Sequence, residues 1–165
     1  EIITKENVGR AQINGSEFSY KQSLYFLPGW GENLQFFANA SFIKPTGSNA
    51  ADFSRYSRKI YNWGLNFARG KVYARVNWNQ RPGDLLEPIG TDPAAPKSWS
   101  TTRTMVSLDV EYRLSRRFSV YGTANNLTDA PEFGRRFAPS TPAYARITGV
   151  SVYGTDFTVG LKGSF

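Results

Sequence analysis

The stretch TDFTVGLKGSF (155–165) at the end of the chain decides the fold. Its apolar face takes every second position, and that series is Phe157, Val159, Leu161, Gly163 and Phe165. Polar residues and one further glycine fill the positions between. Successive side chains of a β-strand point to opposite faces, so this pattern predicts a strand with one apolar face and one polar face.

The same period of two recurs along the chain, at residues 11–26, 34–42, 60–67, 71–78, 105–114 and 118–126. No stretch repeats its apolar residues every 3.6 positions over three turns, so we expect an all-β, antiparallel fold of about seven meandering strands with almost no helix. Within residues 11–26 the apolar phase shifts by one position beside Gly15. Such a shift predicts a β-bulge there.

The expected connections alternate between short and long. Residues 28–33, 69–71 and 115–117 are short turns, whereas residues 44–58, 82–102 and 128–154 are long and rich in Pro, Gly, Ser and Asp. Long strands joined alternately by short turns and long loops are typical of a transmembrane β-barrel. We interpret RITGVSVYG (146–154) as an extension of the last loop and strand, because an eighth strand would break the alternation. The alternative is a soluble β-sandwich, whose strands are usually shorter, about 5 to 6 residues.

The composition narrows the functional classes. The chain has 165 residues with 20 basic and 13 acidic side chains, a formal net charge of +7, and neither Cys nor His. Disulfides and cysteine or histidine metal sites are therefore excluded, and we expect no catalytic residues, no metal and no cofactor. The basic residues are dispersed and no nucleic-acid motif is present, so we expect no nucleic-acid partner.

The hydropathy separates two kinds of membrane protein. The mean hydropathy of −0.44 and the lack of a long apolar run exclude a helical membrane protein. A strand of a transmembrane barrel needs only about 9 to 11 residues with every second one apolar. The low mean hydropathy therefore does not exclude a transmembrane β-barrel. Aromatic residues near the expected strand ends favour a transmembrane β-barrel, because such rings collect at bilayer interfaces. These residues are Phe26, Trp30, Phe67, Tyr112 and Phe118 at the short turns, and Tyr61, Trp63, Trp78 and Phe157 toward the long loops.

Three stretches carry a resemblance to a known family. Asn-Leu-Thr-Asp (126–129) ends an expected outgoing strand, AQINGSE (11–17) opens the first strand, and residues 157–165 form a last strand that ends on an aromatic ring. The chain resembles the C-terminal barrel segment of TonB-dependent outer-membrane receptors. Its last strand is also similar to the outer-membrane assembly signal at Thr158, Gly160, Gly163 and Phe165, although a larger apolar residue is usual in place of Gly163.

The resemblance implies an architecture and a function. Residues 1–165 would be the C-terminal part of a 22-stranded barrel, without the N-terminal plug and TonB-contacting segment. Since EIITKENVGR (1–10) has neither an initiator Met nor a signal peptide, we interpret the chain as the interior of a longer protein. Such receptors lie in the outer membrane of Gram-negative-type bacteria and take up scarce large solutes such as iron chelates, cobalamin or glycans. The alternative is a structural or adhesive outer-membrane barrel without energised transport.

The partners that the resemblance implies are the outer-membrane lipid and lipopolysaccharide, the rest of the receptor and the outer-membrane assembly machinery. TonB would be contacted through the N-terminal part of the receptor. Polar residues of the strands would line the lumen, where they either hold the wall to the plug or contact solute. They are Asn62, Asn66, Arg75, Asn77, Asn79, Asp109, Glu111 and Arg113. Arginines and aromatic residues of the last long loop are the candidates for ligand contact, with lipopolysaccharide phosphates or solvated charge as the alternative. They are Phe133, Arg135, Arg136, Phe137, Tyr144 and Arg146.

Overall fold

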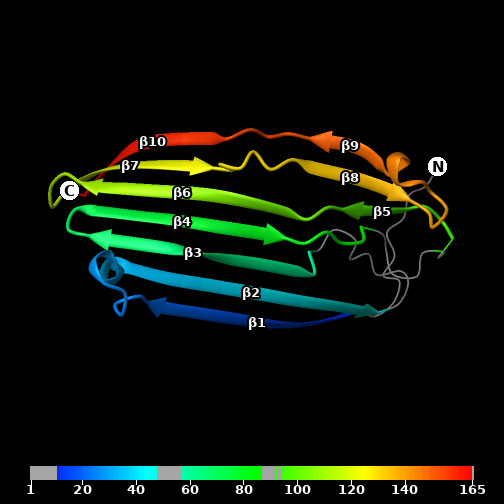
Figure 1. Ribbon diagram of the computed structural model, residues 1–165, viewed down its shortest axis with the longest axis horizontal. Coiled ribbons are helices and arrows are strands. Elements are labelled where there is room, and N and C mark those ends of the chain that lie inside the picture. The colour runs from blue at the N-terminus through cyan, green and yellow to red at the C-terminus, as the bar shows by residue number, and fades with distance from the viewer. Residues whose placement is uncertain (1–10, 48–56, 87–91, 93, 165) are drawn as a thin grey trace, which may run out of the picture.

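The computed structural model describes residues 11–47, 57–86, 92 and 94–164 (Figure 1). This part of the chain is all-β, with two short 3-10 helices, η1 (Gly29–Asn33) and η2 (Ala143–Ala145). Its strands are β1 (Ala11–Ser23), β2 (Leu34–Gly47), β3 (Lys59–Arg69), β4 (Val72–Arg81), β5 (Lys97–Ser100), β6 (Arg103–Arg113), β7 (Phe118–Asn125), β8 (Glu132–Phe137), β9 (Ile147–Ser151) and β10 (Asp156–Gly163). Among these residues no helix is long and apolar enough to cross a membrane.

The strands form two antiparallel sheets. The large sheet has the order β1-β2-β3-β4-β6-β7-β10, and these are the seven strands that the sequence pattern predicts. The small sheet has the order β5-β8-β9, and Figure 1 shows its strands in line with β6, β7 and β10. The predicted all-β antiparallel fold is therefore confirmed. The large sheet is open in the described part of the chain, with β1 and β10 at its two edges.

The strand register places the predicted apolar positions on one face of the large sheet. Residues directly opposite each other on paired strands share a face. One row across the sheet consists of Phe36, Leu65, Val76, Leu108, Ala124 and Phe157. A neighbouring row on the other face consists of Gln35, Asn66, Arg75, Asp109, Thr123 and Thr158. The sheet therefore has one continuous apolar face and one continuous polar face.

The apolar face has no second layer over it in the described part of the chain. The extensive contacts there are between hydrogen-bonded neighbouring strands or between η1 and the strands beside it. Only Phe37 and Ala124 are buried hydrophobic residues among those described, whereas Phe157, Val159 and Leu161 on β10 are 70%, 80% and 73% exposed. A soluble β-sandwich would bury such residues between two sheets, whereas the described residues form only one layer here.

The expected bulge beside Gly15 is wrong. Strands β1 and β2 pair without a break from Ala11 opposite Gly47 to Ser23 opposite Gln35. Ile13 consequently points to the same face as Ser19 and is about half exposed. The apolar residues of the sequence change phase beside Gly15, while the alternation of the backbone continues through it.

The interpretation of residues 146–154 is also wrong. They do not extend β10 but contain β9, which pairs with β8 in the small sheet. Gly154, at a φ of +71°, separates β9 from β10. The long connections 82–102 and 128–154 therefore contain strands that pair with each other, which an alternation rule for the large sheet does not reveal.

Candidate functional site

The eight predicted lumen-lining residues lie on the polar face of the large sheet. Their register places Asn62 opposite Asn79, Asn66 opposite Arg75, and Arg75 opposite Asp109. The remaining three, Asn77, Glu111 and Arg113, keep the same alternation along β4 and β6. The structure therefore brings the whole predicted set to one surface.

Hydrogen bonds between side chains of different strands connect the polar face. Asn79 Nδ2 donates to Asn62 Oδ1. Asn66 Nδ2 donates to Gln35 Oε1 at 3.2 Å, and Lys162 Nζ donates to Glu111 Oε2 at 2.7 Å. The first two bonds join neighbouring strands, whereas the bond between Lys162 and Glu111 reaches across β7 and connects β10 with β6.

Two acceptors on this face have no hydrogen-bond partner within the described residues. They are the side-chain oxygens of Asn77 and Asn79, which are covered by neighbouring atoms of the sheet. An unpaired buried polar atom costs free energy, so these two positions reduce the stability of the sheet.

The polar face also holds an aromatic residue that the sequence pattern does not single out. Phe37 is only 3% exposed, and the Arg75 guanidinium carbon lies 4.5 Å from its ring centroid. A Cβ added to Gly64 would lie 2.7 Å from Phe37 Cζ, so the ring covers that glycine. The sequence feature that could predict this contact is an aromatic residue directly opposite a glycine. It can be recognised only when the register of β2 and β3 is known.

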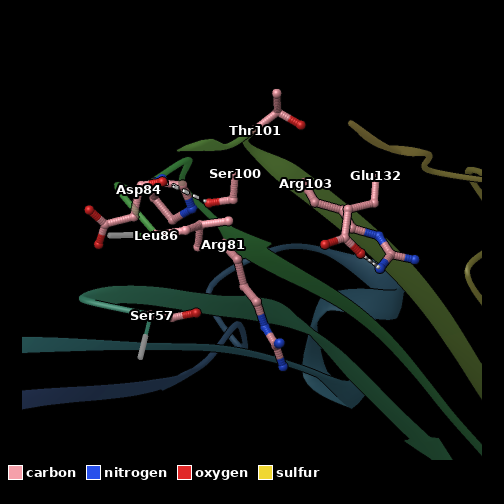
Figure 2. Close-up of a pocket in the computed structure, with 9 residues that line it drawn as sticks. Ser57, Arg81, Asp84, Leu86, Ser100, Thr101, Arg103 and Glu132 are labelled. Carbon is pink, nitrogen blue, oxygen red and sulfur yellow. Dashed lines mark hydrogen bonds and ion pairs between the residues drawn. The ribbon is translucent and has the colours of Figure 1, made fainter. Parts of the chain in front are cut away.

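A small pocket lies where the polar face meets the long connections (Figure 2). Its volume is about 220 Å³, and its lining includes Arg81, Asp84, Arg103 and Glu132. Arg103 Nη1 lies 3.5 Å from Glu132 Oε2. The sequence pattern does not predict this pocket, because its lining comes from four separate segments.

Four of the six predicted loop residues meet at the small sheet. Phe133, Arg135 and Phe137 alternate along β8 and line one hollow together with Trp99 of β5. The rings of Trp99 and Phe137 are stacked at 5.8 Å, and the Arg146 guanidinium lies 4.8 Å from the Phe137 ring centroid. Trp99 is missing from the predicted set, although its position in the short alternation KSWS is a signal.

The other two predicted loop residues lie apart from this hollow. Arg136 follows Arg135 on the same strand, and alternation points its side chain to the opposite side of β8. Tyr144 in η2 is 89% exposed. The predicted group is therefore not a single cluster.

The predicted assembly residues lie along β10, except for Phe165, which is outside the described residues. Thr158 and Gly160 are on the polar face, and Gly163 continues the apolar series. A Cβ on Gly160 would lie 2.5 Å from the Tyr121 ring, so Gly160 provides room for that ring. This contact gives Gly160 a packing role within the sheet.

The NLTD stretch forms a compact corner between β7 and β10. Asn126 is buried at a φ of +55°, its Nδ2 donates to Gly154 O at 2.8 Å, and its Oδ1 accepts from Ala130 N at 3.0 Å. Asp129 Oδ1 accepts from Gly154 N at 3.1 Å. These bonds fasten the start of the last long connection to its end.

The fold and the surfaces define a class: a single-layer antiparallel sheet with one apolar face, one polar face and an extension built from its long connections. In the described residues no group of three or more His, Cys, Asp or Glu could hold a metal ion. No protein-family model, no curated protein and no solved structure matches this chain.

Proposed function

We propose that the chain is part of the wall of an outer-membrane β-barrel that belongs to a TonB-dependent receptor. In this proposal the apolar face contacts lipid and the polar face contacts the lumen and the plug. The long connections lie outside the cell and the short turns in the periplasm. The whole protein takes up a scarce large solute of the iron-chelate, cobalamin or glycan class, and the chain contributes wall and loops rather than bond-breaking chemistry.

The uncovered apolar face is the observation that carries this proposal. Phe157, Val159 and Leu161 are more than two-thirds exposed. Burying apolar surface is favourable by about 25 cal/mol per Å², so a whole sheet face of this kind needs an apolar environment. Lipid supplies that environment for the entire face at once, whereas a soluble partner would need a matching sheet of similar size.

The two edge strands of the large sheet favour a closed barrel rather than an isolated open sheet. Strands β1 and β10 each have one side without a partner strand in the described part of the chain. An open sheet edge in lipid leaves backbone N–H and C=O groups unpaired at a cost of several kcal/mol each. Additional strands of the same protein would pair with both edges and close the barrel.

The polar face supports a lumen on that side of the sheet. Its row of Gln35, Asn66, Arg75, Asp109, Thr123 and Thr158 offers hydrogen-bonding and charged groups across the whole sheet. The inner face of a membrane barrel is polar in the same way. The receptor class itself rests on the resemblance of the NLTD corner and the terminal strand.

Membrane fractionation tests the barrel. The complete gene product that contains this chain should enter the outer-membrane fraction and migrate faster on a gel before boiling than after it. A soluble product, or one whose migration does not change on boiling, would contradict the proposal.

The reading frame upstream of Glu1 and a transport assay distinguish the receptor from a structural or adhesive barrel. A receptor requires a plug-sized domain preceded by a short TonB-contacting segment. Uptake should also stop when TonB is deleted. A signal peptide directly before Glu1 would favour the non-transport alternative.

A further inference from the structure

The side chains of the small sheet can be assigned to the two sides of the large sheet. Arg103 lies opposite Arg81 on the polar face, and its guanidinium contacts Glu132 at 3.5 Å. Glu132 therefore points to the polar-face side. Its neighbour Phe133 must point to the opposite side, which is the side of the apolar face.

The same alternation assigns the rest of the hollow. Arg135 and Phe137 follow Phe133 at every second position of β8, and the register places Trp99 opposite Arg135 and Lys97 opposite Phe137. These residues, with the Arg146 guanidinium on the Phe137 ring, form one surface on the side of the apolar face. We call Lys97, Trp99, Phe133, Arg135, Phe137 and Arg146 the aromatic–cationic patch.

The patch is positively charged and partly open. None of Lys97, Arg135 and Arg146 belongs to an ion pair within the described residues. Arg146 Nε donates to Thr141 O, which holds the side chain in place. Arg135 is exposed, and the rings beside it are half buried. The patch therefore combines three cations with a surface of three aromatic rings.

The position of the patch decides which ligand it meets. Figure 1 shows the small sheet in line with β6, β7 and β10, beyond their long-connection ends. In the proposed membrane orientation this is the level of the outer-leaflet headgroups, and the patch is on the lipid side. A solute that enters the barrel would instead pass along the polar face.

We infer that the aromatic–cationic patch binds the phosphate groups of a phosphorylated glycolipid in the outer leaflet. This inference rests on the proposed outer-membrane location. Arginine guanidinium groups form charge-assisted, often bidentate hydrogen bonds with phosphate. Tryptophan and other aromatic rings are favoured at the headgroup level of a membrane. The patch would thus fasten the outer loops to the membrane surface.

Strand β8 provides the variants for the test. The double variant Arg135→Gln/Arg146→Gln removes two cations from the patch. Arg136→Gln is the matched control, because it removes the same kind of side chain from the next position on the opposite side of the strand. Both use the complete protein in detergent, with heat-modifiable migration as the check that each variant folds.

The binding measurement uses bis-phosphorylated lipid A and the same lipid without phosphates. Losing a charge-assisted hydrogen bond corresponds to about tenfold in affinity, so the double variant should bind lipid A at least about tenfold more weakly than the native protein. Arg136→Gln should bind like the native protein. The phosphate-free lipid should bind weakly to all three.

Three results would overturn the inference. The first is an equal effect of the double variant and Arg136→Gln, and the second is equal binding of the phosphate-free lipid. The third is displacement of lipid A by millimolar inorganic phosphate, which would assign the patch to free anions. If the native protein is folded in the outer membrane but shows one of these results, only the inference fails. If it does not reach that membrane, the proposed function fails.

Discussion

The ring of Phe37 covers the backbone of Gly64 on the neighbouring strand. The two residues are directly opposite in the register of β2 and β3, and the Arg75 guanidinium carbon lies 4.5 Å from the centroid of the Phe37 ring. A similar pair occurs on β7 and β10, where the Tyr121 ring covers Gly160. An aromatic ring that covers a glycine across the strands shields the exposed backbone and specifies the register.

Replacing Gly64 with alanine should destabilise the sheet. The new Cβ would lie 2.1 Å from the backbone oxygen of Val76 and 2.7 Å from Phe37 Cζ, so both would have to move. Overpacking of this kind costs about 1 to 3 kcal/mol. Urea unfolding of the complete protein, followed by gel migration, measures the change.

Gly122 is the matched control for Gly64. A Cβ there would meet its nearest atom, Thr158 O, at 3.8 Å, which is ordinary contact. Gly122→Ala should therefore keep the unfolding midpoint close to that of the native protein. Equal losses of stability at both positions would show that the Phe37 contact is not the cause.

The two faces of β6 should respond differently to charge. Val110 lies on the apolar face, where an arginine near the bilayer midplane costs about 2 to 4 kcal/mol. Asp109→Asn, on the polar face, should have only a small effect. The fraction of each variant that inserts into the outer membrane measures this difference, and equal insertion defects would mean that the assignment of faces is wrong.

Cysteine labelling should distinguish the two ends of the strands. The native chain has no Cys, so a single Cys at Ala94 or at Ser140 in the long connections provides a unique label. Both should react with a membrane-impermeant thiol reagent on whole cells. A Cys at Arg116, in the short turn between β6 and β7, should react only after lysis; reaction at Arg116 alone on whole cells would reverse the proposed orientation.

Asn126 should be important for the corner between β7 and β10. Asn126→Ala removes the side-chain bonds to Gly154 and Ala130, and alanine adopts the left-handed φ of +55° less readily than asparagine does. Leaving the partly buried backbone groups of Gly154 and Ala130 unpaired costs about 1 kcal/mol or more. Limited proteolysis should then cut the connection between β7 and β10 faster than in the native protein.

Asn125→Ala is the control for this corner, because Asn125 is exposed at the end of β7. Its proteolysis rate should match that of the native protein. Faster cutting in both variants would indicate a general loosening of β7 rather than loss of the corner.

The sequence by itself determined the strands of the large sheet and the face that each side chain takes. Both follow from a local rule, since neighbouring side chains of a strand point to opposite faces. For this reason all eight polar residues from Asn62 to Arg113 lie on one face, and the apolar series of β10 continues that of β7. The seven strands of the large sheet and their antiparallel order needed no long-range information.

Only the tertiary structure decided what depends on the pairing of distant segments. Three features are properties of two strands together: the packing of the Phe37 ring over Gly64, the unbroken register past Gly15, and the pairing of β9 with β8. The contact between Arg103 and Glu132 then assigns the two sides of β8 and separates Arg135 from Arg136. A single strand specifies only its own alternation, whereas register and side follow from hydrogen bonds and side-chain contacts between strands far apart in the chain.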